Sequence, residues 1–379
     1  MRFPTGLARR HPEPTLVDSD LTAGIPWHPA SGQIESLDGI RFISIMIVFV
    51  GHAGWGDIIP GGFGVTIFFF LSGYLITTLL RRELTRHGSI SLKKFYLRRA
   101  IRIWPAFYLV LTACVVMSIT GVLSRTLAWD SVALQYLHLA NYDQMFNGNA
   151  GIPAGTEVYW SLAVEEHFYL LFPLAFMLMS RRGLPLRRIA AVLATACVVI
   201  LAWRLVLILG LDADMHHTYY ASDTRFDSIL LGCILAVWHN PALDPDPLTE
   251  RTWKYVAAPA GLLAIVATFA IRDESFRETF RYSVQGIALM PLFWCAIRYP
   301  AWGPMRWLNT RTAAFMGRLS YAFYLVHFTV ILWLAERLPR IGQVPRAGIA
   351  FALSTALAYL VHLAVERPLA PIRHRLGRS

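Results

Sequence analysis

The chain has 379 residues, of which 55% are hydrophobic and only 16% are charged, and its mean hydropathy is +0.46. A soluble protein carries about 25% charged residues, so this composition excludes an ordinary soluble globular protein. The net charge of +11 does not require a nucleic acid partner, because the basic residues are distributed as in a membrane protein.

The sequence predicts a short tail at each end of the chain. Residues 1–36 contain several prolines and no apolar run, which predicts a flexible cytoplasmic N-terminal tail. They do not read as a secretory signal, which needs an apolar core directly after its basic start. Residues 370–379 are expected to form a cytoplasmic C-terminal tail.

Between the tails, apolar runs of roughly 20 residues recur, and this is the length that crosses a bilayer. The sequence therefore predicts an all-α fold, a polytopic transmembrane helical bundle formed by residues 37–369. We expect about ten spans, of which the sixth is the weakest: 37–55, 61–80, 103–123, 158–179, 189–210, 226–239, 254–271, 283–298, 313–334 and 348–366.

The basic residues predict the orientation of these spans. If the N-terminus lies inside, most of the 35 Lys and Arg fall on the cytoplasmic side, and eight of them cluster in residues 81–102. The positive-inside rule then places both termini in the cytoplasm. We expect a multi-pass protein of the cell membrane, the plasma or inner membrane.

The sequence contains little that suggests a bound metal or a permanent cofactor. All four cysteines (Cys114, Cys197, Cys233 and Cys295) lie inside expected spans without paired spacing, so they are interpreted as packing residues. The sequence has no glycine-rich phosphate loop and no cluster of metal ligands.

The first span carries Arg41 and His52, two residues that a bilayer disfavours. Eleven residues at about 100° each make close to three turns, so both side chains project from one face, about 16 Å apart. Asp38 is a candidate ion partner for Arg41. An arginine that snorkels to the surface and a histidine bonded to a neighbouring carbonyl would explain the pair equally well.

At the entry of the third span, Arg99 and Arg102 are three residues apart and therefore share a helix face. Paired guanidinium groups suit phosphate, because each offers a planar fork of donors. The positive-inside rule explains the neighbouring Arg81 and Arg82. It does not require two arginines on one face.

The fourth span carries a polar stripe in which Ser161, Glu165 and Tyr169 are spaced four residues apart and lie on one side of the helix. Glu166 points about 100° away. Carboxylates within a span are rare and costly, which favours a functional role. This helix enters from outside, so Glu165 is expected at a depth similar to that of His52.

Four polar residues are candidates for acceptor-side or supporting roles, namely Tyr169 of the fourth span and three residues of the later spans. Arg225 and Asp227 lie at the outer mouth of the sixth span, and His327 lies in the ninth span on a face with small and aromatic residues. Helix packing would explain His327 equally well. His362, in the last span, lacks a polar stripe and is assigned a structural role.

Seven segments in chain order resemble the motifs of one known family. Within "YWSLAVEEHFYLLFP", His167 stands where that family commonly has glutamine. The family is the membrane-bound acyltransferase family 3, typified by bacterial O-antigen and exopolysaccharide acetylases. The segments that carry the resemblance are "LDGIRFISIMIVFVGH" (37–52), "FFFLSGYLI" (68–76), "FYLRRAIRIWPAFY" (95–108), "YWSLAVEEHFYLLFP" (159–173), "DTRFDSILLGCILA" (223–236), "GRLSYAFYLVHF" (317–328) and "VERPL" (365–369). The sequence ends soon after the last motif, as in members without an extracellular esterase-like domain.

The resemblance implies an integral membrane O-acyltransferase. Its donor substrate would be cytoplasmic acyl-CoA, with acetyl-CoA favoured, and its acceptor a hydroxyl of a carbohydrate, lipid-linked glycan or glycosylated metabolite. His52 then matches the catalytic histidine, with Glu165 as the acidic position of the fourth span. A neutral His52 is expected to act as general base, and Glu165 to orient its imidazole and stabilise the charged form. Arg41, Arg99 and Arg102 would bind the donor. Direct transfer is preferred, since no serine or cysteine stands out as a nucleophile.

Two other classes of membrane protein also place histidine within apolar helices. A polytopic transporter or proton-coupled exporter would also use intramembrane His, Glu and Arg. It predicts broken helices at mid-membrane and inverted repeats, and the sequence shows no convincing self-similarity. The unrelated membrane-bound O-acyltransferases also use a histidine in an apolar helix, but their signatures do not match these segments.

Overall fold

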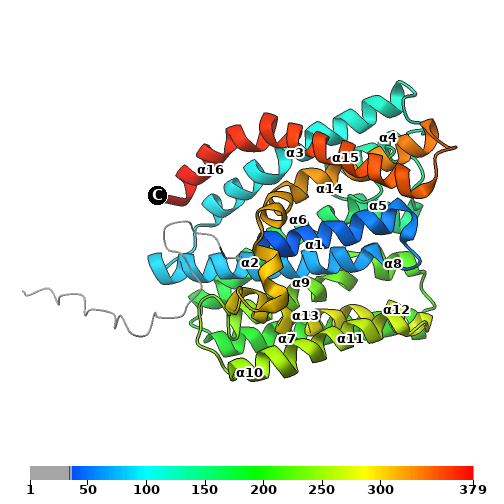
Figure 1. Ribbon diagram of the computed structural model, residues 1–379. Helices are drawn as coiled ribbons and strands as arrows, with labels where there is room; N and C mark the ends of the chain where they lie inside the picture. The colour runs from blue at the N-terminus through cyan, green and yellow to red at the C-terminus, as the bar shows by residue number, and fades with distance from the viewer. Residues whose placement is uncertain (1–33, 35, 379) are drawn as a thin grey trace, which may run out of the picture.

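The computed structural model describes residue 34 and residues 36–378 of the chain. The expected N-terminal tail therefore lies almost wholly outside the described residues. Residues 370–378 of the expected C-terminal tail form the end of a helix, α16 (Arg367–Arg378). The described chain is a bundle of helices that run roughly alongside one another (Figure 1).

Each expected span corresponds to a helix of the bundle, although several boundaries differ. The first span is α1 (Leu37–Val50), continued by a π-helical turn, Gly51–Trp55. The others, in chain order, are α2 (Gly61–His87), α3 (Leu92–Ile119), α6 (Trp160–Arg181), α7 (Leu186–Leu205), α9 (Ser222–Val237), α11 (Ala258–Ala270), α13 (Phe280–Arg298), α14 (Arg311–Arg337) and α15 (Gln343–Val361).

Among the described residues, eight helices are long and apolar enough to cross a membrane, rather than ten. The other two are α9 and α13. At 16 residues, α9 spans about 24 Å, which is shorter than a hydrocarbon core of about 30 Å. Both helices are largely buried by their neighbours, so α9 fits a position inside the bundle better than one against lipid.

The third helix begins earlier than its apolar run. α3 starts at Leu92, where the side chain of Ser91 accepts a hydrogen bond from the Lys94 backbone and caps the helix. Arg99 and Arg102 are therefore truly helical and share one face. Pro105 lies in the interior of α3, and it deprives the backbone of one hydrogen bond.

Two glycines bring α2 and α9 into backbone contact at the centre of the bundle. A Cβ at Gly73 would lie 1.9 Å from the carbonyl oxygen of Ile229, and one at Gly232 would lie 2.0 Å from that of Phe70. Small residues at such crossings let helices approach closely, which is how transmembrane helices pack without a hydrophobic driving force. The crossing fixes the position of Ser72, whose role is described below.

The connections gather at the two ends of the bundle. The short helices at the right-hand end of Figure 1 lie in connections expected outside: α4 (Trp129–Tyr136), α5 (Ala140–Asn147), α8 (Met215–Tyr220) and α12 (Glu274–Glu278). The C-terminal end of α16 and α10 (Glu250–Thr252) lie towards the left. The expected inside and outside connections therefore separate as predicted. Which end faces the cytoplasm remains a prediction.

Candidate active site

Five helices (α1, α2, α3, α6 and α14) enclose a cavity of about 100 Å³, which we call the chamber. Its wall combines mainly apolar side chains of α2 with mainly polar side chains from the other four helices. Five of the nine site residues expected from the sequence lie on this wall: Arg41, Arg99, Arg102, Glu165 and Tyr169. The tertiary structure thus brings together residues that the sequence spreads over three helices.

Glu165 is held in the chamber by two hydroxyl groups. The Ser72 hydroxyl donates to Glu165 Oε1 over 2.7 Å, and the Tyr169 hydroxyl donates to Oε2 over 3.1 Å. The two hydroxyl oxygens lie 3.0 Å apart. Ser72 lies in a family motif, but the sequence gives no reason to single it out from other serines in apolar helices. Its contact with Glu165 joins α2 to α6.

The arginines of the chamber differ in their partners. Arg41 forms an ion pair with Asp38, as the sequence predicted. The guanidinium of Arg99 lies 5.2 Å from the centre of the Tyr169 ring, a cation–π contact. Arg102 makes no hydrogen bond or ion pair within the described part of the chain. Guanidinium donors on a cavity wall are suited to an anionic ligand.

A wider cavity of about 390 Å³ adjoins the chamber and is called the vestibule here. It is formed by the ends of α1, α2, α3, α14 and the C-terminal helices. Three further arginines line it, Arg82, Arg318 and Arg367, whereas its carboxylates are Asp38 and Glu366. The vestibule and the chamber share these wall residues: Arg41, Leu75, Arg102, Ser320 and Tyr321.

Two residues that the sequence interprets as structural or topological have more specific contacts. His362 lines the vestibule, and its Nδ1 lies 2.6 Å from Glu366 Oε2. Arg81 forms a two-point ion pair with Asp244, with donor–acceptor distances of 2.9 and 2.8 Å. Arg81 is therefore part of the packing, and a variant at this position would disturb the fold.

His52 lies in the π-helical turn at the end of α1, and its contact is another histidine. Its Nδ1 lies 3.0 Å from Nε2 of His327 on α14. His52 is partly exposed, whereas His327 is fully buried. π turns within helices occur frequently at functional sites. The expected pairing of His52 with Glu165 is not among the hydrogen bonds of the described residues.

Tyr324 connects the histidine pair to the chamber. Its side chain lines the chamber, and its hydroxyl lies 2.7 Å from the hydroxyl of Ser161. Its backbone carbonyl lies 2.8 Å from His327 Nδ1. The pair therefore begins one turn of α14 beyond the chamber wall. The vestibule, the chamber and the two histidines follow one another along the bundle.

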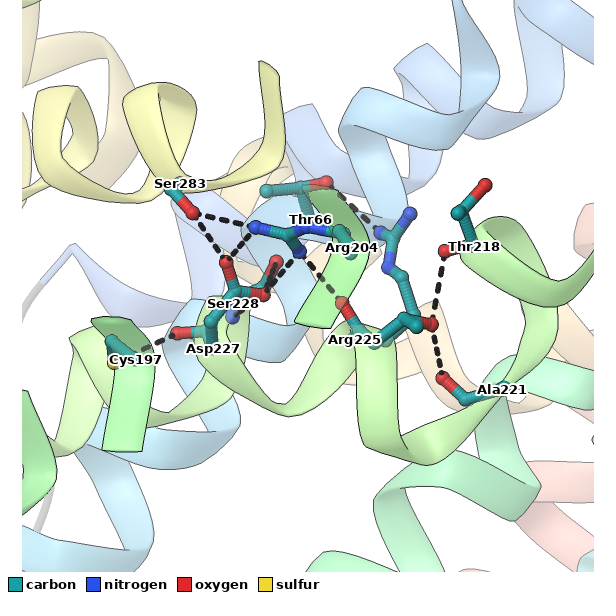
Figure 2. Close-up of polar contacts among 10 residues, drawn as sticks. Thr66, Cys197, Arg204, Thr218, Ala221, Arg225, Asp227, Ser228 and Ser283 are labelled. Atoms are coloured by element: carbon teal, nitrogen blue, oxygen red, sulfur yellow. Dashed lines mark hydrogen bonds and ion pairs between the residues drawn. The ribbon is translucent and has the colours of Figure 1, made fainter. Parts of the chain in front are cut away.

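Arg225 lies apart from both cavity walls, in a cage of aromatic rings. Its guanidinium carbon lies 3.8 Å from the centre of the Tyr282 ring and within 5.7 Å of the rings of Phe69, Trp160 and Tyr219. One guanidinium nitrogen donates to the Thr66 hydroxyl over 3.4 Å (Figure 2). Cation–π contacts therefore supply most of what stabilises this buried charge.

Asp227 faces a different part of the bundle and is paired with Arg204 of α7, a residue that the sequence reasoning did not single out. Its two oxygens accept from Arg204 over 3.0 and 2.6 Å, and the hydroxyl of Ser283 donates to it over 2.6 Å (Figure 2). All atoms of the pair are fully buried. These contacts join α7, α9 and α13, so Asp227 supports the bundle rather than an outer mouth.

The described residues contain no cluster of three or more His, Cys, Asp or Glu that could hold a metal ion. The four cysteines are all buried and unpaired. The chemical groups at the site are guanidinium groups, the carboxylates of Glu165 and Glu166 on the chamber wall, and an imidazole pair beyond it. This set can bind an anion at one end and move a proton at the other.

A family model described as an acyltransferase domain matches residues 34–363. The peptidoglycan O-acetyltransferase OatA of Listeria monocytogenes is 28% identical over 316 residues, which cover 79% of this chain and 49% of the relative. The O-acetyltransferase OatA of Staphylococcus aureus (strain NCTC 8325 / PS 47) is 30% identical over 353 residues, 89% of this chain and 57% of the relative. The chain thus spans about half the length of these relatives. No solved structure matches it.

Proposed function

The chain belongs to the acyltransferase domain family that its motifs resemble, and we propose that it transfers an acyl group from acyl-CoA to a hydroxyl group of a carbohydrate. The observation that carries this proposal is an arginine-lined vestibule that adjoins the chamber, with a histidine pair one helical turn beyond the chamber wall. The acyl group is an acetyl group, as the names of the relatives suggest. The chain is a multi-pass protein of the cell membrane.

The vestibule is the proposed entrance for the donor. Acyl-CoA carries its phosphates at one end and its thioester at the other, joined by the long pantetheine arm. Arg41, Arg99 and Arg102 are the proposed donor-binding residues, and the vestibule and chamber walls carry all three. Guanidinium groups bind phosphate oxygens through paired charged hydrogen bonds. The pantetheine arm then lies in the chamber, with the thioester towards Tyr324 and the histidines.

His52 is the proposed general base. Its imidazole takes the proton of the acceptor hydroxyl while the hydroxyl oxygen attacks the thioester carbonyl carbon. The carbon–sulfur bond breaks, and the departing thiolate receives the same proton from His52. The products are the acyl ester and free CoA, so atoms and charges balance without an acyl-enzyme. No Cys or Ser nucleophile is required in this scheme.

Glu165 is assigned to the donor half of the site. Its hydrogen bonds with Ser72 and Tyr169, and its place on a wall with three arginines, support a role in shaping the donor site. The Tyr169 ring lies against Arg99, so Tyr169 connects Glu165 to one of the donor-binding arginines. This assignment replaces the expected one, in which Glu165 orients His52.

The acceptor is proposed to reach His52 from outside the cell. With both termini in the cytoplasm, the vestibule faces the cytoplasmic acyl-CoA pool and His52 lies in the outer half of the membrane. The Listeria relative is named a peptidoglycan O-acetyltransferase and the Staphylococcus relative an O-acetyltransferase, and this supports a cell-envelope glycan as the acceptor class. A lipid-linked glycan or a glycosylated metabolite offers the same hydroxyl chemistry.

The proposal is tested with purified protein, radiolabelled acetyl-CoA and soluble peptidoglycan fragments. His52→Ala should lower transfer by at least about 100-fold, because a general base contributes roughly 10²–10⁴. Donor binding, measured by calorimetry, should persist, since the phosphates are held in the vestibule. His216→Ala, at a half-exposed histidine of α8, is the matched control and should retain activity. Near-normal transfer by His52→Ala would refute the proposed role of His52 as general base.

A further inference from the structure

We propose that His327 is a positioning residue that fixes the tautomer of His52, so that His52 presents an unprotonated Nε2 to the acceptor. This inference rests on the proposed role of His52 as general base. It goes beyond that role by assigning the proton of each ring nitrogen. The carrying observation is a chain of two hydrogen bonds that ends on a backbone carbonyl.

The first proton is placed by the backbone. His327 Nδ1 lies 2.8 Å from the carbonyl oxygen of Tyr324, and a carbonyl oxygen can only accept a hydrogen bond. His327 Nδ1 must therefore carry a hydrogen. A neutral imidazole has one N–H, so His327 Nε2 carries a lone pair and accepts.

The second proton follows from the first. His52 Nδ1 lies 3.0 Å from His327 Nε2, which is within hydrogen-bond distance for two nitrogens. One of the two must donate, and His327 Nε2 cannot. His52 Nδ1 therefore carries the hydrogen, and the lone pair of His52 lies on Nε2. That nitrogen is the one turned away from His327.

The surroundings keep His327 neutral and out of reach of substrate. It is fully buried, and its ring lies near the rings of Phe323, Tyr324 and Phe328 at centroid distances of 5.9, 5.5 and 6.3 Å. Its hydrogen-bond partners within the described residues are the Tyr324 carbonyl and His52. A charged imidazolium in such surroundings would be poorly solvated. His52 is partly exposed, so the two histidines have unequal roles.

The arrangement serves both halves of the transfer. When Nε2 of His52 takes the hydroxyl proton, the ring becomes an imidazolium, and its Nδ1–H remains bonded to His327 Nε2. The hydrogen bond then becomes charge-assisted and strengthens. When the carbon–sulfur bond breaks, Nε2 returns its proton to the thiolate, and both rings regain their starting tautomers. No other proton donor or acceptor is required.

The direct test is nitrogen spectroscopy on the full chain labelled with 15N-histidine. The His52 signals are identified as those that disappear in the His52→Gln variant. In the parent protein Nδ1 of His52 should be protonated and Nε2 unprotonated. In His327→Phe this preference should be lost, whereas His327→Gln retains an oxygen acceptor and should preserve most of it. Protonated Nε2 in the folded parent would overturn the proposal.

Kinetics provides the second readout. His327→Phe should lower kcat by up to roughly 10²–10⁴, the whole contribution of a general base, with an unchanged KM for acetyl-CoA. His327→Gln should recover most of kcat. A raised KM with an unchanged kcat would make His327 a binding residue and refute the positioning role.

The two readouts separate this inference from the proposed function. The expected tautomer in a protein that transfers no acyl group would refute acyl transfer and leave the proton assignment standing. Acyl transfer by a protein whose His52 has the opposite tautomer would refute the proton assignment and leave the proposed function standing. If His327→Phe does not fold, the parent spectrum and the His327→Gln variant still decide the assignment.

Discussion

Replacing Asp227 by asparagine tests whether this residue supports the fold or the chemistry. In the structure its carboxylate accepts from both terminal nitrogens of Arg204 and from Ser283, and the pair is fully buried. Asparagine has nearly the same shape but no charge. The variant therefore leaves the Arg204 guanidinium buried without a counter-ion, which costs about 3–5 kcal/mol when one partner of a buried ion pair is removed.

A loss of this size should be visible as a shift of the unfolding temperature. For a domain of a few hundred residues, it corresponds to a fall in Tm on the order of 5–10 °C. The four native cysteines are all buried, so a thiol-reactive fluorescent dye reports unfolding of the detergent-solubilised protein. Activity per folded molecule should be retained, because Asp227 lines neither the chamber nor the vestibule.

The matched control removes both charges together. Replacing Arg204 by methionine and Asp227 by leucine exchanges the ion pair for apolar side chains of similar volume, which is often neutral or stabilising. The free energy of unfolding of this double variant should lie within about 1 kcal/mol of the parental value or exceed it. The reasoning would be refuted by an Asp227→Asn protein that keeps the parental Tm and loses acyl transfer, because the residue would then act in the reaction.

Three further outcomes are expected. Arg102→Ala should weaken acetyl-CoA binding roughly 10- to 150-fold, because a charged hydrogen bond contributes about 1.5–3 kcal/mol. The control Arg182→Ala, at an exposed arginine, should bind acetyl-CoA normally, and equal affinities of the two variants in calorimetry would contradict the proposed donor site. Cysteines introduced at Ser89 and Asn147, both exposed and at opposite ends of the bundle, should label from opposite sides of the membrane, and labelling from one side would end the proposed topology. Gly73→Val should give no monodisperse peak in gel filtration, because even a Cβ at this position would lie 1.9 Å from a backbone carbonyl oxygen. A monodisperse variant would show that α2 and α9 can move apart at this crossing.

Features that depend on nearby residues could be predicted from the sequence. Hydrophobicity over 20 residues determines whether a segment can span the bilayer, and this placed a helix at each expected span. Helical periodicity determined that Arg99 and Arg102 share a face, and the motif order identified the family. The early start of α3 was missed because its first turns are basic and amphipathic rather than apolar.

Contacts between distant helices were decided only by the tertiary structure. His52 and His327 are 275 residues apart, and Ser72 and Glu165 are 93 residues apart. Periodicity specifies which side chains share a face of one helix, but it does not specify which helix that face meets. The sequence predicted Glu165 at the depth of His52, whereas the packing placed a second histidine beside His52 and Glu165 among the arginines.

The same limit applies to burial. The sequence marked α9 as the weakest span, and its close crossing with α2 through Gly73 and Gly232 makes it a buried helix of the bundle. Arg225 and Asp227 are both charged residues near the start of α9, yet Arg225 lies in an aromatic cage and Asp227 forms an ion pair. Two residues correspond to about 200° of rotation, so these side chains lie on nearly opposite faces of α9 and meet different neighbours. The partner of a polar side chain within a membrane is therefore fixed by helix packing and not by the local sequence.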